Sequence, residues 1–238
     1  MKIKKILNKI LLFQIFLPLL LLKGCAFAPL GVKFDAGNYL ASQNDKIGKS
    51  SQILLVKDES FLFFTSSKLY VMERQGDMWT MAFEPFTSVI GRNGFLPLGE
   101  KKEGDGKTPA GIYTLKLAFG YPESINTKMP YRQARSDDIW VDDPDAEDYN
   151  RWTKLNETKA TSYEMMKRDD HQYKYGIVIE HNTDPVVKGN GSAIFLHIWK
   201  EKNAPTAGCV AVSEEDILKI LQWLDPAKLP LIITGAGK

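Results

Sequence analysis

Residues 192–213, SAIFLHIWKEKNAPTAGCVAVS, decide the fold of this chain and carry its most distinctive side chains. An apolar run at residues 193–199 and a shorter β-rich run at residues 210–212 predict two strands, joined by a loop that contains proline and glycine. His197 lies within the first strand, and Cys209 stands immediately before the second. Two such strands bring an imidazole beside a thiol, which is the minimum equipment for covalent catalysis by a thiol.

Both residues also have a plainer interpretation. A histidine on an apolar strand is often a core residue, and a free cysteine often behaves as a small buried apolar side chain. His171 and His181 are alternative bases. Gly208 favours the catalytic interpretation, because a residue without a Cβ lets a substrate carbonyl approach the backbone, where the N–H groups around Cys209 can stabilise an oxyanion.

Short runs rich in aromatic and β-branched residues recur outside this stretch, separated by turn signals. They predict a mainly β domain of the α+β class, with a β-sandwich-like sheet, a C-terminal helix packed on it, and long polar loops. The helix begins after Ser213, which with Asp216 resembles a capping box, and it ends at Asp225-Pro226. The other predicted strands are residues 52–57, 61–65, 69–72, 78–83, 88–90, 112–115, 175–180 and 230–234.

Two further segments are expected to face a ligand. Residues 91–111 are dense in glycine, which permits tight turns beside a groove. They contain Gly106-Lys107-Thr108, but this is not a phosphate-binding loop, because Lys101 stands where that motif needs a glycine. Residues 121–170 are polar and aromatic with weak periodicity, and they predict a long substrate-facing loop. The aspartates in this loop lack the spacing of an EF-hand, so no metal is expected.

The first thirty residues differ from the rest of the chain. Four lysines precede an apolar block at residues 10–22, which predicts a signal peptide over residues 1–28 and is short for a membrane span. Residues 26–28 offer a cleavage site, whereas residues 22–25 resemble a bacterial lipobox in which Cys25 is lipidated; an uncleaved anchor is the alternative. We expect an exported, lipid-anchored protein of the periplasm or cell envelope. A linker at residues 29–50 would then lead to a catalytic domain at residues 51–238.

The charge and cysteine content of the chain limit the kinds of partner and chemistry that we expect. The chain has 238 residues, of which 25% are charged, and its net charge is +2 with the basic residues scattered, so a nucleic-acid partner is not expected. There are two cysteines. Once Cys25 is lipidated or removed, Cys209 is the single thiol of the mature domain, and an unpaired thiol in an oxidising compartment is a candidate reactive group.

Several motifs together resemble one known family. His197 followed by Thr206-Ala207-Gly208-Cys209-Val210 is similar to the catalytic motif of the YkuD-type L,D-transpeptidases, which are cysteine enzymes of the bacterial cell wall. The resemblance covers most of residues 88–234. It also includes residues 91–94, residues 103–111, Asp142-Asp143-Pro144 with Tyr149-Asn150, and residues 189–209.

This resemblance implies a reaction and roles. Cys209 would be the nucleophile and His197 its base, oriented by a backbone carbonyl, with the oxyanion held by backbone groups at Gly208 and Cys209. The enzyme would cleave a peptidoglycan tetrapeptide stem after the L-centre of meso-diaminopimelate and release D-alanine. A second stem amine, or water, would resolve the thioester without a cofactor. Thr206 would bind substrate. Because the chain departs from the family pattern, four arginines are candidates to take over recognition of the substrate carboxylate, since a guanidinium suits a carboxylate; they are Arg92, Arg132, Arg135 and Arg151.

The chain departs from the family pattern at two positions. Ala207 replaces the histidine before the glycine, and Ala211 replaces the arginine or asparagine after the aliphatic residue. The spacing of twelve residues from His197 to Cys209 is also shorter than usual. Two alternatives therefore stay open: a carboxypeptidase or endopeptidase that hydrolyses peptidoglycan, and a catalytically inert lipoprotein that binds the cell wall.

Overall fold

The computed structural model describes residues 34–59, 66–97 and 99–236. The signal peptide expected at residues 1–28, with Cys25, and the strand expected at residues 61–65 lie outside the described residues. Within the described part of the chain, no helix is both long and apolar enough to cross a membrane.

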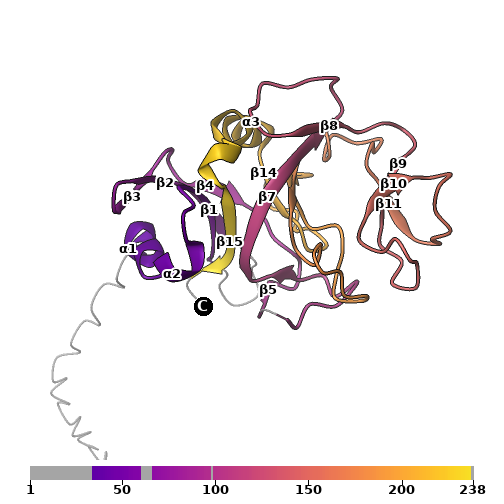
Figure 1. The fold of residues 1–238 in the computed structure, drawn as a ribbon, viewed down its shortest axis with the longest axis horizontal. Coiled ribbons are helices and arrows are strands. Elements are labelled where there is room, and N and C mark those ends of the chain that lie inside the picture. The colour runs from indigo at the N-terminus through magenta and orange to yellow at the C-terminus, as the bar shows by residue number, and fades with distance from the viewer. Residues whose placement is uncertain (1–33, 60–65, 98, 237–238) are drawn as a thin grey trace, which may run out of the picture. The chain divides into compact units, whose positions relative to one another are not determined.

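One large mixed sheet forms the centre of the molecule (Figure 1). Its strand order is β14-β13-β12-β7-β15-β1-β2-β3, and β4 and β8 branch from β2 and β7. The predicted hairpin at residues 69–83 is present as β2 and β3, and the closing strand is present as β15. The strands are β1 (Gln52–Asp58), β2 (Ser67–Gln75), β3 (Met78–Met81), β4 (Phe86–Ser88), β7 (Gly111–Gly120), β8 (Tyr131–Gln133), β12 (Tyr175–Ile179), β13 (Phe195–Ile198), β14 (Val210–Val212) and β15 (Leu231–Ala236).

The two ends of this sheet are joined through Val89. That residue follows β4, which pairs with β2, and it forms a bridge to Ala211 of β14. The N–H of each bridge residue donates to the carbonyl of the other, at 2.8 and 2.9 Å. The sheet therefore curls around the main apolar core, and β14 is held between β13 and the segment after β4.

Residues 121–170 are more ordered than the long loop expected from the sequence. They contain a separate three-stranded sheet in the order β10-β9-β11, which Figure 1 shows beyond β8. The strands are β9 (Asp138–Val141), β10 (Trp152–Lys154) and β11 (Tyr163–Met165). These strands have only three or four residues each, so no periodicity marks them in the sequence. A two-stranded pair, β5 (Phe95–Leu96) and β6 (Thr108–Pro109), lies within the glycine-rich segment.

Two short helices occupy part of the expected linker. These are α1 (Ala36–Ala41) and α2 (Asn44–Ile47), and they pack against the sheet rather than extending away from it. Asp35 caps α1 by accepting a hydrogen bond from the N–H of Asn38 at 2.9 Å. Leu40 is fully buried in a cluster with residues of β1, β2, β3 and β15. The folded part of the chain therefore begins before residue 51.

The C-terminal helix α3 (Glu214–Trp223) starts at the predicted cap, Ser213, whose hydroxyl accepts from the N–H of Asp216 at 3.1 Å. Ile217, Ile220 and Leu221 face the core inside the curled sheet, and the 3₁₀ turn η1 (Pro226–Lys228) follows. A mainly β architecture with a C-terminal helix on the sheet is thus confirmed. The outer face of the sheet carries two further apolar clusters, one under α1 and α2 and one between β12, β13 and the small sheet β10-β9-β11.

Candidate active site

His197 in β13 and Cys209, immediately before β14, lie on one face of the sheet. The strands are parallel, with Leu196 opposite Val210 and His197 opposite Ala211. Leu196 and Val210 point into the core inside the curled sheet, whereas Phe195 and Cys209 belong to the outer cluster beside the small sheet. Side chains alternate along a strand, so His197 shares the outer face with Phe195 and Cys209.

Cys209 is held by the backbone of the neighbouring strand. Its thiol donates to the carbonyl of Ala193 at 3.2 Å, and its sulfur accepts from the N–H of Phe195 at 3.4 Å. Burial raises the pKa of this thiol to about 12, and the negative charge of Glu164 acts in the same direction. The resting side chain is therefore a thiol and not a thiolate.

His197 is buried and neutral. Its Nδ1 lies 2.8 Å from the carbonyl oxygen of Ile198, and a carbonyl only accepts, so Nδ1 carries the proton and Nε2 is the unprotonated nitrogen. The backbone of Gln172 also interacts with the ring. Burial lowers the pKa of the imidazole to about 4. The ring edge packs against Tyr173, with centroids 5.2 Å apart. Among the described residues, His197 and Cys209 make no hydrogen bond to each other; each is bonded to backbone groups instead.

The carbonyl that accepts from the thiol belongs to a strained residue. Ala193 has a φ of 52°, which a side chain with a Cβ adopts at a cost of about 1–2 kcal/mol. The amide oxygen of Asn150 accepts from the N–H of Ala193 at 3.2 Å and from the indole of Trp140 at 2.8 Å. Asn150 therefore fixes the conformation that presents the Ala193 carbonyl to Cys209.

The loop before Cys209 is closed by Thr206. The Thr206 hydroxyl accepts from the N–H of Gly208 at 3.1 Å and donates to the carbonyl of Cys209 at 2.6 Å. A Cβ on Gly208 would stand 3.0 Å from the carbonyl oxygen of Lys107, so glycine is needed for the close approach of the glycine-rich segment. The Gly208 N–H, expected to bind an oxyanion, is occupied by Thr206 here.

The four candidate arginines do not gather at Cys209. The backbone N–H of Arg92 donates to the carbonyl of Thr206 at 3.0 Å, which brings this residue to the cysteine loop. Arg132 pairs with Asp138 at 2.9 Å and stacks over Trp152, and Arg151 donates to the carbonyl of Thr183 at 2.7 Å. Arg135 is exposed near Asp138.

The other two histidines have their own partners. His171 is exposed, and its Nε2 lies 3.1 Å from the carbonyl oxygen of Trp199. His181 contacts the carbonyl oxygen of Asn190 at 2.9 Å and packs on Tyr113.

Sequence reasoning missed four residues beside the pair. Glu164 accepts a hydrogen bond from the hydroxyl of Tyr173, and Arg168 stacks over the Tyr173 ring while it pairs with both carboxylate oxygens of Asp170. They come from the weakly periodic part of the chain between residues 121 and 173. The mixture of charged and aromatic residues there was the only signal, and it does not select individual positions.

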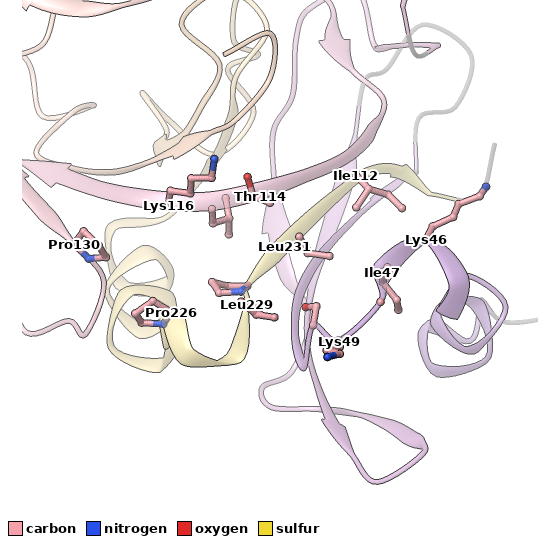
Figure 2. A pocket seen from close by; sticks show the side chains of 14 residues that line it. Lys46, Ile47, Lys49, Ile112, Thr114, Lys116, Pro130, Pro226, Leu229 and Leu231 are labelled. Atoms are coloured by element: carbon pink, nitrogen blue, oxygen red, sulfur yellow. The ribbon is translucent and has the colours of Figure 1, made fainter. Parts of the chain in front are cut away.

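A groove of about 720 Å³ lies elsewhere on the molecule (Figure 2). Its walls come from α2, β7 and the segment from η1 to β15, and they combine apolar side chains such as Ile47 and Leu231 with three lysines, Lys46, Lys49 and Lys116. None of the residues that line this groove belongs to the cysteine–histidine site.

The fold and site define a mainly β domain that carries a cysteine and a histidine on adjoining strands. Residues 59–233 match the family model of YkuD, the L,D-transpeptidase catalytic domain. The chain therefore belongs to the YkuD family, and this membership supports a function associated with peptidoglycan.

Comparisons with solved structures and with curated proteins add no further evidence about function. The chain resembles the crystal structure of the helical cell shape determining protein Pgp2 from Campylobacter jejuni at 17% identity, over 83% of this chain and 54% of that one. It thus spans about half of that protein, and the TM-score of 0.41 is too low to support a conclusion. A comparison with curated proteins gave no match.

Proposed function

We propose that this protein is a peptidoglycan L,D-transpeptidase that works through a thioester on Cys209. One observation carries the proposal: a neutral thiol and an imidazole whose Nε2 is unprotonated lie on one face of adjoining strands in a YkuD domain. A protonated thiol needs a base before it can attack an amide carbonyl, and a neutral imidazole is the group that can take its proton.

The proposed reaction has two halves. His197 Nε2 takes the thiol proton as the sulfur of Cys209 attacks the carbonyl carbon of the stem peptide. The imidazolium then gives that proton to the departing amine of D-alanine as the C–N bond breaks, which leaves a thioester. An amine from a second stem attacks the thioester and passes a proton to His197, which returns it to the sulfur. The shared outer face of β13 and β14 supports this proton path.

Incubation of the purified protein with tetrapeptide muropeptides, followed by mass spectrometry, tests the proposal. We expect an acyl adduct on Cys209, free D-alanine and a cross-linked product, and we expect Cys209→Ala to give none of them. The matched variant Cys209→Ser keeps the shape of the side chain but is a weaker nucleophile, so it should be strongly impaired. If wild-type protein and Cys209→Ala behave alike, the proposal is wrong.

One observation favours the alternative hypothesis of a catalytically inert protein that binds the cell wall. Cys209 is buried, and burial raises the pKa of its thiol to about 12. Alkylation of Cys209 near neutral pH should therefore be slow in the resting protein under either hypothesis. An increase in the alkylation rate when a stem peptide is added would favour the enzyme. Binding to sacculi without any adduct would favour a wall-binding protein. Adding and omitting an acceptor amine distinguishes cross-linking from hydrolysis.

We also propose export to the periplasm or cell envelope with a lipid on Cys25. The support is the basic and apolar sequence of residues 1–28 and the lipobox-like residues 22–25. Metabolic labelling with an alkyne fatty acid should mark the wild-type protein and leave Cys25→Ala unlabelled. Recovery of an unlabelled, uncleaved chain from the cytoplasmic fraction would contradict both parts of this proposal.

A further inference from the structure

Tyr173 contacts His197 directly and is linked to Cys209 through Phe195. Its ring meets the imidazole of His197 edge-on, with centroids 5.2 Å apart, and meets the ring of Phe195 at 5.6 Å. The N–H of Phe195 in turn donates to the sulfur of Cys209. Tyr173 itself is buried, so the position of its ring bears directly on where the imidazole can sit.

The hydroxyl of Tyr173 is held by the small sheet. It donates to Glu164, which belongs to β11. A buried phenol hydroxyl needs a partner, and a carboxylate is a strong acceptor. Arg168 lies over the face of the ring, 5.1 Å from its centroid, and is itself fixed by Asp170. The ring is thus restrained at its hydroxyl, at its face and at its edge.

The charges around the pair come from the same group of residues. The charges of Glu164, Lys101 and Arg168 act on the pKa of Cys209, and those of Arg168 and Asp170 act on the pKa of His197. Lys101 is paired with Asp105 at 2.5 Å, and Arg168 is paired with Asp170 at 2.9 Å. Glu164 has no such cation at salt-bridge distance among the described residues, and its carboxylate accepts a hydrogen bond from the Tyr173 hydroxyl.

We propose that Tyr173 and Glu164 are positioning residues for His197: the hydroxyl bond to Glu164 fixes the Tyr173 ring, and the ring fixes the imidazole with Nδ1 on the Ile198 carbonyl and Nε2 unprotonated. This inference deepens the proposed function and rests on the assignment of His197 as its base. It gives the small sheet β10-β9-β11 a role, because β11 supplies the residue that anchors the ring.

Three variants separate this role from simple packing. Tyr173→Phe keeps the ring and loses the hydroxyl, Glu164→Leu loses the acceptor, and Glu164→Gln keeps an acceptor oxygen for the hydroxyl. Tyr131→Phe is the matched control, since the Tyr131 hydroxyl also bonds a partner, the carbonyl of Pro122, but Tyr131 packs on the core inside the curled sheet. Thermal unfolding checks that each variant is folded.

The first readout needs no substrate. Proton NMR of the histidine ring should show the Hδ1 resonance of His197 protected from exchange in the wild type, because this proton is bonded to Ile198. We expect that resonance to be lost in Tyr173→Phe and Glu164→Leu and kept in Glu164→Gln and Tyr131→Phe. If Glu164→Leu does not fold, Tyr173→Phe alone decides the outcome. Protection that is equal in Tyr173→Phe and wild type would overturn the proposal.

The second readout is turnover of tetrapeptide muropeptides. Tyr173→Phe and Glu164→Leu should each lower kcat by roughly tenfold to a hundredfold with little change in KM, because misplacing a reacting group costs rate. The double variant should lose no more than the worse single variant, since both act through one hydrogen bond. Multiplicative losses would overturn the proposal. If the wild type is inactive, the proposed function fails, and the NMR readout still decides this inference.

Discussion

His197 and Cys209 are both buried, and burial favours the uncharged form of each side chain. Burial raises the pKa of the thiol to about 12 and lowers the pKa of the imidazole to about 4. The pair therefore rests as two neutral groups rather than as a thiolate–imidazolium ion pair. A neutral pair has to transfer its proton during attack, which makes the orientation of His197 Nε2 the decisive geometric feature of the site.

The buried imidazole predicts a pH dependence of stability. The pKa of His197 is lowered from 6.5 to about 4 in the folded protein, so between these values the unfolded chain binds the extra proton. Stability that is present above pH 6.5 is therefore lost as the pH falls toward 4, by on the order of 3 kcal/mol from this residue.

Urea unfolding of wild-type protein and His197→Gln at several pH values from 7 to 4 measures this effect. The glutamine does not titrate, so we expect the free energy of unfolding of His197→Gln to fall less steeply with acid, while the carboxylates contribute equally to both proteins. Parallel curves would show that the imidazole of His197 titrates at the same pH in the folded protein as in the unfolded chain, and would contradict a lowered pKa.

At the scale of elements, α3 carries a cap that can be tested by itself. The Ser213 hydroxyl accepts from the N–H of Asp216 and donates to its carboxylate at 2.6 Å, and α3 follows β14 directly. Ser213→Ala should lower the free energy of unfolding by about 1 kcal/mol, because one N-terminal N–H loses its partner. The alkylation rate of Cys209 should not change, since β14 is fixed by β13 and Val89.

Ser42→Ala is the matched control for the cap. The Ser42 hydroxyl also bonds backbone, the carbonyl of Tyr39 at 2.6 Å, but it lies at the exposed C-terminal end of α1. We expect its effect in chemical denaturation to stay within about 0.5 kcal/mol. Equal losses in the two variants would indicate that the cap of α3 contributes nothing specific.

At the scale of the whole molecule, the residue at which the cooperatively folded unit begins can be tested. Helices α1 and α2 bury Ala36, Leu40 and Ile47 against β1, β2 and β3. A chain that starts at residue 34 should keep the full free energy of unfolding. A chain that starts at residue 51 should lose at least about 3 kcal/mol, because removing buried Leu and Ile side chains costs 2–5 kcal/mol each.

Denaturant unfolding of both shortened proteins, with Leu40→Ala in the longer one as an intermediate case, measures the contribution. If the chain from residue 51 is as stable as the chain from residue 34, the helices do not belong to the cooperative unit and residues 34–50 act as the linker expected from the sequence.

Local sequence determined the elements whose signals are strong and short-range. The hairpin around Gly76, the helix α3 with its cap at Ser213, and the strands around His197 and Cys209 all follow from periodicity, turn residues or capping within one segment. The motif around Cys209 also determined the family, which the match over residues 59–233 confirms.

Only the tertiary structure decided the rest, because it depends on hydrogen bonds and contacts between distant segments. The bridge from Val89 to Ala211 closes the sheet, Asn150 holds Ala193, and Glu164 holds Tyr173 against His197. The positions of the four candidate arginines were also decided by contacts between segments, since their partners lie on other elements. A sequence pattern specifies which face a side chain takes on its own strand, but the fold decides which distant residue stands opposite it.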